Sequence, residues 1–316
     1  MMHYRKLGSS SLNVSPICLG GNVFGWTVDE RQSFKLLDGF IDSGFNFVDT
    51  ADMYSRWVQD NRGGESETII GNWLKKRGGR DKVIIATKFG MEMAPNKVGL
   101  SPEYMMQAVE DSLRRLQTDY IDLYQSHKDD ENTPVTATLE GYQRLIEQGK
   151  VREIGASNFS ATRLQEALDA SDNGLPRYQS LQPLYSLVER NEYETEMEEL
   201  CRQENIGVIS YFSLASGFLT GKYRNEQDIS GRARGPAVQK YLNADGFRVI
   251  STLNEIAEQF GAKIGQVAVA WLMARPSITA PIVSATNMEQ LQELLDSAEL
   301  SLGEENINKI DLASAF

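Results

Sequence analysis

Cysteine and histidine are scarce in this chain of 316 residues, which contains two of each. Cys18 and Cys201 are too few for a disulfide framework or a cysteine zinc site. They leave open a single disulfide, although reduced thiols are the better expectation. His3 and His127 do not have the HExxH spacing of a catalytic zinc site, so the sequence predicts no metal.

Positive charge is also in short supply. The 32 Lys and Arg residues are outnumbered by 44 Asp and Glu residues, and the net charge is −12. This balance gives no electrostatic footprint for DNA or RNA, so we expect no nucleic-acid partner. The uncharged stretch Leu7–Val28 is interrupted by serines, Pro16 and Gly20–Gly21, and it is neither a signal-peptide core nor a membrane span. We therefore expect a cytoplasmic protein without a membrane partner.

The composition, with 41% apolar and 24% charged residues, is that of a globular protein. Apolar, β-branched runs of about five to seven residues recur along the chain between turn residues, as in strands buried on both faces of a parallel sheet. The expected strands are Pro16–Gly20, Phe45–Asp49, Lys82–Lys88, Tyr120–Ser126, Val151–Ser157, Tyr178–Gln182, Ile206–Tyr211 and Ile278–Val283.

Segments with helical spacing of apolar residues separate these runs. One of them repeats Phe34, Leu37 and Ile41 on one face, and another opens with Pro102 in its first turn. The expected helices are Asp29–Ser43, Glu65–Lys76, Ser101–Leu116, Pro134–Gln148, Ser160–Ala170, Tyr193–Asn205, Ala244–Gln259, Ile264–Arg275 and Met288–Ala298.

Eight strands that alternate with helices predict a parallel sheet, and eight such units favour a closed (β/α)8 TIM barrel over an open doubly wound sheet. The length allows two domains, but no linker divides the chain, so we expect residues 1–316 to form a single domain. The stretch before Pro16, the loop Tyr223–Lys240 and the tail Gly303–Phe316 fall outside the repeat. We interpret them as an N-terminal plug, a long functional loop on the C-terminal face and a closing helix.

Charged and polar residues end several expected strands, at the face where such barrels carry their active sites. Asp49, Lys88 and His127 are informative there because burying an unpaired charge is costly. We expect Asp49 and Lys88 to form a buried ion pair near Tyr54, and the ammonium to lower the pKa of Tyr54 from about 10. A tyrosine tuned in this way can exchange a proton with a carbonyl or alcohol oxygen that His127 orients. These groups suit carbonyl reduction if a hydride donor lies alongside.

Short motifs follow one another along the whole chain, each near the end of an expected strand. They are Leu7–Ser15 with Leu19–Gly21, Gly44–Ala51 followed by Tyr54, Ser66–Glu67 with Ile70–Gly71, Lys88, Asp122–His127, Gly155–Phe159, and Tyr211 with Ser213–Leu214 and Gly217–Lys222. Through these motifs the sequence resembles the aldo-keto reductase family. The resemblance implies a (β/α)8 barrel that binds an extended nicotinamide cofactor without a Rossmann fold. Consistently, Gly231–Gly235 is no GxGxxG fingerprint.

The resemblance also implies catalytic roles. Tyr54 would be the general acid, Asp49 and Lys88 the pair that tunes it, and His127 the residue that orients the substrate. The aromatic residues near these motifs either line a substrate pocket or only pack, and we expect them to line it. They are Trp26, Trp57 and Phe89.

The cofactor would lie along residues that follow the later strands. The resemblance assigns the nicotinamide to Ser157, Asn158, Gln182 and Tyr211, and the pyrophosphate to Ser213, Leu214, Gly217 and Lys222. After the last strand, the family's site for the 2′-phosphate of NADP(H) would use Ser284, Thr286 and Gln290, in a stretch without Lys or Arg. The family slightly favours NADP(H), but NAD(H) stays open. Arg232 and Arg234 of the long loop are an alternative source of positive charge.

The sequence thus predicts an NAD(P)(H)-dependent aldo-keto reductase that acts reversibly on an aldehyde, ketone or sugar. Two alternatives stay open. Some relatives of this fold are cofactor-binding regulatory subunits of ion channels, which would make this protein an interaction module. The other alternative is an NAD-dependent sugar or alcohol dehydrogenase.

Overall fold

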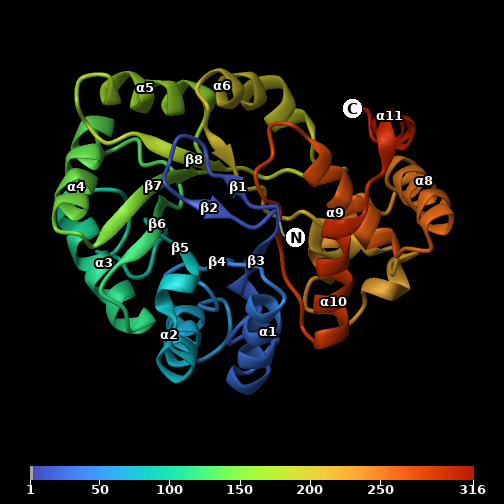
Figure 1. The fold of residues 1–316 in the computed structure, drawn as a ribbon, viewed down its shortest axis with the longest axis horizontal. Helices are drawn as coiled ribbons and strands as arrows, with labels where there is room; N and C mark the ends of the chain where they lie inside the picture. The colour runs from blue at the N-terminus through green and yellow to red at the C-terminus, as the bar shows by residue number, and fades with distance from the viewer. Residues whose placement is uncertain (1–2) are drawn as a thin grey trace.

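Eight parallel strands form one sheet in the computed structural model, which describes residues 3–316 (Figure 1). Their order is β10-β3-β4-β5-β6-β7-β8-β9. The sheet closes because Val208 of β9 bridges Ile278 in parallel and the Ile282 amide donates to the Ser210 carbonyl at 2.8 Å. The strands are β3 (Cys18–Gly20), β4 (Phe47–Asp49), β5 (Ile84–Phe89), β6 (Ile121–Ser126), β7 (Val151–Ser157), β8 (Tyr178–Gln182), β9 (Gly207–Val208) and β10 (Ile282–Val283).

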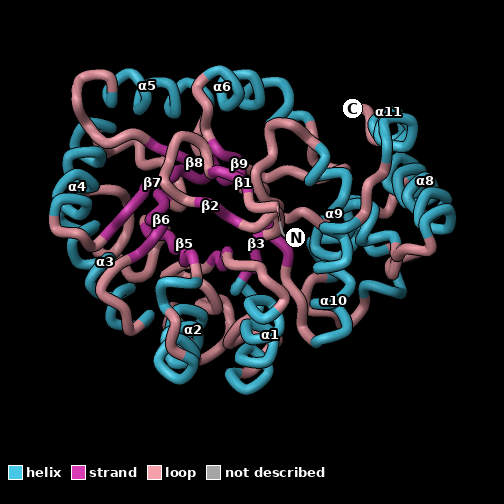
Figure 2. Tube along the Cα trace, in the orientation of Figure 1, coloured by secondary structure: helices cyan, strands magenta, loops and turns pink. Residues whose placement is uncertain are grey.

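Helices surround this ring of strands, and the predicted (β/α)8 barrel is confirmed (Figure 2). Asp29, Ser101 and Ser160 begin helices as expected, because the side chain of each accepts a hydrogen bond from the amide three residues on. The helices are α1 (Glu30–Asp42), α2 (Glu65–Arg77), α3 (Pro102–Leu116), α4 (Val135–Glu147), α5 (Ala161–Ser171), α6 (Glu198–Gln203), α7 (Gly235–Val238), α8 (Ala244–Phe260), α9 (Ile264–Ala274), α10 (Met288–Asp296) and α11 (Gly303–Ala313).

The two strands that flank the closure are shorter than the sequence predicts. The amides of Thr279 and Ala280 both approach the Val208 carbonyl, at 2.9 and 3.2 Å, so the ladder between β9 and β10 is irregular. The helix expected over Tyr193–Asn205 also differs, because it starts with a π-helical turn, Tyr193–Met197, before α6. Apolar periodicity predicted both elements but not their local hydrogen bonding.

A hairpin closes the N-terminal end of the barrel, as predicted for a plug. Its strands, β1 (Arg5–Lys6) and β2 (Asn13–Val14), lie across the centre of the strand ring in Figure 1. Leu7 and Leu12 of the hairpin are buried with Phe47 and other interior residues of the barrel strands. At Gly8, where φ is +56°, a Cβ would stand 2.3 Å from the Gln179 carbonyl oxygen, so no side chain fits. The hairpin therefore leaves the opposite, C-terminal face as the place for a site.

The two cysteines are far apart in the fold and both are free. Cys18 lies in β3 and Cys201 in α6, and each is buried. The structure therefore contains two thiols and not the disulfide that the sequence left open. Within residues 3–316, no helix has the length and apolar character needed to cross a membrane.

Candidate active site

A buried ion pair lies at the C-terminal ends of β4 and β5. Lys88 Nζ donates to Asp49 Oδ2 at 2.7 Å, and the two side chains are 0% and 1% exposed. The same nitrogen donates to the Thr50 carbonyl and to the Tyr54 hydroxyl, both at 2.8 Å. All three protons of the ammonium therefore have acceptors, and the charge is fixed against the Tyr54 oxygen.

Strand alternation decides which side chains of β5 reach this site. Ala86 and Lys88 point into the barrel, whereas Thr87 points outward and donates to Glu67 of α2 at 2.6 Å. Phe89 also points outward and is fully buried, with its ring stacked on Tyr124 at 4.9 Å. The expectation that Phe89 lines the substrate pocket is therefore wrong, because it is the neighbour of an inward-facing lysine.

The second oxygen of Asp49 is also held. Gln182 Nε2 donates to Asp49 Oδ1 at 2.9 Å, and Gln125 Nε2 lies 3.4 Å from the same oxygen. Gln182 lies on β8, Gln125 on β6 and Lys88 on β5, so side chains from three other strands hold the Asp49 carboxylate. Gln182, which the sequence assigns to the nicotinamide, also lines the cavity described below.

Tyr54 has the opposite pKa shift from the one expected. Its hydroxyl donates to Asp49 Oδ2 at 3.2 Å and accepts from Lys88. Burial of the phenol, and then the nearby carboxylate of Asp49, raise the pKa of Tyr54 well above its ordinary value. The sequence prediction considered only the ammonium and was wrong in sign. The phenol is consequently protonated at neutral pH.

His127 directly follows β6 and lies beside the Tyr54 ring. Its ring centroid lies 6.0 Å from that of Tyr54, with the planes at 74°. Burial, and then the Lys88 charge, lower the pKa of His127 well below its usual value, so the imidazole is neutral. Within residues 3–316, its buried Nδ1 has no hydrogen-bond partner.

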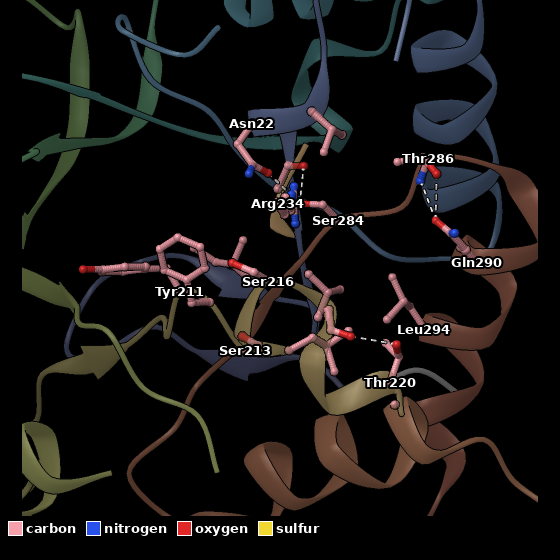
Figure 3. A pocket seen from close by; sticks show the side chains of 18 of the residues that line it. Asn22, Tyr211, Ser213, Ser216, Thr220, Arg234, Ser284, Thr286, Gln290 and Leu294 are labelled. Carbon is pink, nitrogen blue, oxygen red and sulfur yellow. Dashed lines mark hydrogen bonds between the residues drawn. The ribbon is translucent and has the colours of Figure 1, made fainter. Parts of the chain in front are cut away.

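A single cavity of about 1260 Å³ joins this cluster to α8, α9 and α10. All of the residues that the sequence assigns to the cofactor line it, and Figure 3 shows several of them around the space. They are Ser157, Asn158, Gln182, Tyr211, Ser213, Leu214, Gly217, Lys222, Ser284, Thr286 and Gln290. The cavity is large enough for an extended ligand and includes Tyr54 in its lining.

Hydrogen bonds order the part of the cavity nearest His127. Asn158, with φ at +54°, donates through Nδ2 to the His127 carbonyl at 2.8 Å. Tyr211 donates its hydroxyl to Asn158 Oδ1 at 2.7 Å, and Ser157 donates to the Gln182 carbonyl at 2.9 Å. A left-handed asparagine costs conformational energy, which is typical of residues held for function.

Three cations of the long loop Tyr223–Lys240 and the residue before it line the cavity. Lys222, Arg232 and Arg234 all line it, and none of their side chains forms an ion pair with any residue in 3–316. Burial, followed by the two arginines, lowers the pKa of Lys222. The Arg234 guanidinium lies over the Trp26 ring, 5.5 Å from its centroid. Three like charges gathered in an acidic protein indicate an anion-binding site.

Comparison with known proteins decides the family. The sequence model of the Aldo/keto reductase family matches residues 16–315. The chain belongs to the aldo-keto reductase family. It is 34% identical to "Uncharacterized oxidoreductase YrpG" of Bacillus subtilis (strain 168), over 98% of this chain and 95% of the relative. It is 32% identical to "Protein tas" of Escherichia coli (strain K12), over 98% and 97%, and 33% identical to "Probable voltage-gated potassium channel subunit beta" of Arabidopsis thaliana, over 95% and 92%.

Family membership makes this aldo-keto reductase an oxidoreductase that uses a nicotinamide cofactor. Within the described residues, 3–316, no group of three or more His, Cys, Asp or Glu side chains could hold a metal ion. The family and its cavity agree with the sequence-based fold and activity class.

Hydrogen bonds within the chain also order the part of the cavity near α10 in this aldo-keto reductase. Gln290 Oε1 accepts from the amide and the hydroxyl of Thr286, both at 2.9 Å (Figure 3). Ser284 Oγ lies 2.7 Å from Asn22 Oδ1 and 2.9 Å from the Gly20 carbonyl. The hydroxyls of Ser284 and Thr286 therefore already have acceptors within the chain.

Of the three aromatic residues expected to line the substrate pocket of this aldo-keto reductase, only Trp57 lines the cavity. Trp57 lines the cavity, and its ring centroid lies 6.1 Å from that of Tyr54. Trp26 does not line the cavity but packs edge to face on Trp57 at 5.6 Å. Sequence reasoning missed Phe212, which lines the cavity beside Tyr211, and interpreted Lys128, which lines it beside His127, as part of a solvated loop bordering the pocket. Their position next to motif residues was the available signal.

The pH dependence of this aldo-keto reductase follows from the two shifts. Tyr54 is protonated below its raised pKa and His127 is neutral above its lowered one, so neither titrates near neutrality. We expect kcat for carbonyl reduction to be flat between about pH 6.5 and 9. With Tyr54 as the expected acid–base group, the oxidation direction should speed up as pH rises, because deprotonated Tyr54 accepts a proton more readily. A pH–rate profile of kcat checks this, and a step in the reductive profile near an ordinary histidine pKa would contradict it.

Proposed function

We propose that this protein reduces the carbonyl group of a small molecule with NAD(P)H, with Tyr54 as the proton donor. The arrangement of Lys88 Nζ between Asp49 and the Tyr54 hydroxyl, at 2.7 and 2.8 Å, carries the proposal. It places a protonated phenol at the end of a cavity large enough for the cofactor. We further propose that residues 1–316 act as one domain in the cytoplasm.

The residues around the cavity fit a dinucleotide. Lys222, Arg232 and Arg234 would bind the pyrophosphate, because these cations line the cavity without pairing with a protein anion. Asn158 and Tyr211 would hold the nicotinamide, since both stand beside His127. A bound reduced nicotinamide supplies hydride to the substrate's carbonyl carbon.

Side chains of the protein then carry out the proton transfer. Tyr54 donates its proton to the developing alkoxide oxygen, and the Lys88 ammonium stabilises the phenolate that remains. Asp49 holds the Lys88 side chain in place. The neutral His127 can donate one N–H to the same oxygen and so orient the carbonyl. Because Tyr54 rests in its protonated form, we propose that reduction is the favoured direction.

The proposal is tested by mixing the protein with NADPH or NADH and 4-nitrobenzaldehyde and following the absorbance of the reduced nicotinamide. Turnover with either cofactor supports it. Binding of both cofactors without turnover of this or other reactive aldehydes would overturn it.

A regulatory role is the second candidate, and the similarity to the Arabidopsis channel subunit favours it. It predicts tight cofactor binding with negligible turnover in the same assay. The third candidate, an NAD-dependent dehydrogenase of a sugar or alcohol, predicts faster oxidation of alcohols with NAD⁺ than reduction of aldehydes. Both directions can be compared in one cuvette.

A positive charge introduced where we propose that the adenosine lies should change the preference between NADPH and NADH. We expect Gln290→Arg to raise the affinity for NADPH over NADH about tenfold, because a charged hydrogen bond contributes about 1.5–3 kcal/mol. Gln290 lines the cavity, whereas Gln292 on the same helix is exposed and does not. Dissociation constants from fluorescence titration check the ratio, with Gln292→Arg as the control. An unchanged ratio in Gln290→Arg would place recognition of the 2′-phosphate elsewhere, as at Arg232 or Arg234.

A further inference from the structure

Several large apolar side chains line the cavity that contains Tyr54. Met53, Trp57, Met91 and Phe212 contribute them, from loops that follow different strands. Trp57 and Phe212 are 46% and 49% exposed, which is a large exposure for aromatic residues at the mouth of a cavity. Exposed apolar surface in a concave site marks a place that a ligand covers.

The two aromatic walls are held in position. Trp57 packs against the rings of Trp26 and Tyr54, at 5.6 and 6.1 Å between centroids. Phe212 packs on Tyr211 at 5.4 Å and has a φ of +56°, a strained value for a bulky residue. Two aromatic side chains held in place in one cavity suit a flat ring, and the two methionines can adapt to its outline.

An unpaired cation stands at the same mouth. Lys128 follows His127 and lines the cavity, and its side chain makes no hydrogen bond or ion pair with residues 3–316. The adjacent acids are turned away, since Arg163 donates to Asp129 at 2.8 Å and Thr133 donates to Asp130 at 2.6 Å.

The carboxylates that line the cavity do not offset this charge. Asp49 is already bonded to Lys88, Tyr54 and Gln182. Glu258 and Glu293 belong to α8 and α10, which form the other end of the cavity. The end of the cavity near Tyr54 therefore combines apolar side chains with a positive charge on Lys128 that no protein anion pairs.

We propose that the substrate is an aromatic aldehyde or ketone that carries a carboxylate. Its ring lies against Trp57 and Phe212, its carboxylate faces Lys128, and its carbonyl oxygen faces Tyr54. This inference rests on the proposed function. The carbonyl carbon gains hydride from the cofactor and its oxygen gains the Tyr54 proton, so the product is the alcohol and the carboxylate is unchanged. A sugar would turn its hydroxyl groups against apolar walls that cannot bond them.

The test compares 4-carboxybenzaldehyde with its methyl ester, which has the same ring and carbonyl but no charge, and with D-xylose. We expect KM for the acid to be about tenfold lower than for the ester, in keeping with one charged hydrogen bond. Lys128→Met should remove the difference, and Lys128→Arg should keep it. Lys35→Met is the matched control, because Lys35 is exposed on α1 and does not line the cavity.

A binding measurement separates this inference from the proposed function. Quenching of tryptophan fluorescence, to which Trp57 contributes, reports binding of the product 4-(hydroxymethyl)benzoate and of its methyl ester without turnover. Tighter binding of the acid that is lost in Lys128→Met supports the inference, even if no aldehyde is reduced and the proposed function fails. Equal binding of acid and ester, no binding of either, or a higher kcat/KM for D-xylose than for the aromatic acid would overturn it.

Discussion

Tyr54→Phe is expected to lower kcat for carbonyl reduction by about 10²–10⁴-fold, the usual contribution of a general acid. The substitution removes the hydroxyl that donates to Asp49 and accepts from Lys88. The ring itself stays, with the Lys88 ammonium 4.6 Å from its centroid and Trp57 at its edge. The cofactor's dissociation constant should therefore change little, and steady-state kinetics with a fluorescence titration measures both quantities.

The matched control for this substitution is Tyr4→Phe. Tyr4 is exposed and donates its hydroxyl to the Gly44 carbonyl, at the end of the barrel away from the cavity. Tyr4→Phe should therefore leave kcat the same as in the unmodified protein. If Tyr54→Phe retained near-normal turnover, the assignment of the proton donor would be wrong.

Lys88→Met is expected to lower the free energy of unfolding by about 3–5 kcal/mol, because it leaves the Asp49 carboxylate buried without its cation. Combining it with Asp49→Asn should restore most of that stability, since no buried charge is then unpaired. Activity should be absent from both variants, because neither holds a cation against the Tyr54 oxygen. Urea unfolding and kcat, measured on both variants, separate the structural role of the pair from its catalytic role.

A surface pair provides the comparison. Arg202 and Glu199 lie three residues apart on α6 and are both exposed, so Arg202→Met should affect stability far less than Lys88→Met. If the double variant were as unstable as Lys88→Met, the loss would come from packing and not from the unpaired charge. Turnover at a normal rate in the double variant would argue against a catalytic role for the pair.

Local sequence was sufficient for much of the site. Asp49, Lys88 and His127 end apolar strands, and in a parallel barrel these ends meet at one face, so their proximity followed from the strand pattern. The same strand pattern also predicts that Phe89 points away from the barrel interior. It follows an inward-facing residue, and the two-residue period of a strand turns it to the helices.

Other features depend on contacts that no local pattern contains. Arg234 meets Trp26 only because a long loop near the end of the chain reaches the first loop of the barrel. The pKa of Tyr54 depends on how deeply the phenol is buried beside Asp49, and burial is a property of the assembled barrel. The irregular bonds around Val208 likewise depend on how the last strands meet at the closure.

The two buried thiols have a practical consequence. Burial raises the pKa of the Cys18 thiol well above its ordinary value and that of Cys201 to about 12. Both are therefore protonated and shielded in the native state, and a thiol-specific reagent reaches either one only when the chain opens around it. Cys18 reports on opening of the barrel interior and Cys201 on release of α6. The rates at which the two native thiols are labelled would therefore measure how fast the barrel interior and α6 open, without any added cysteine.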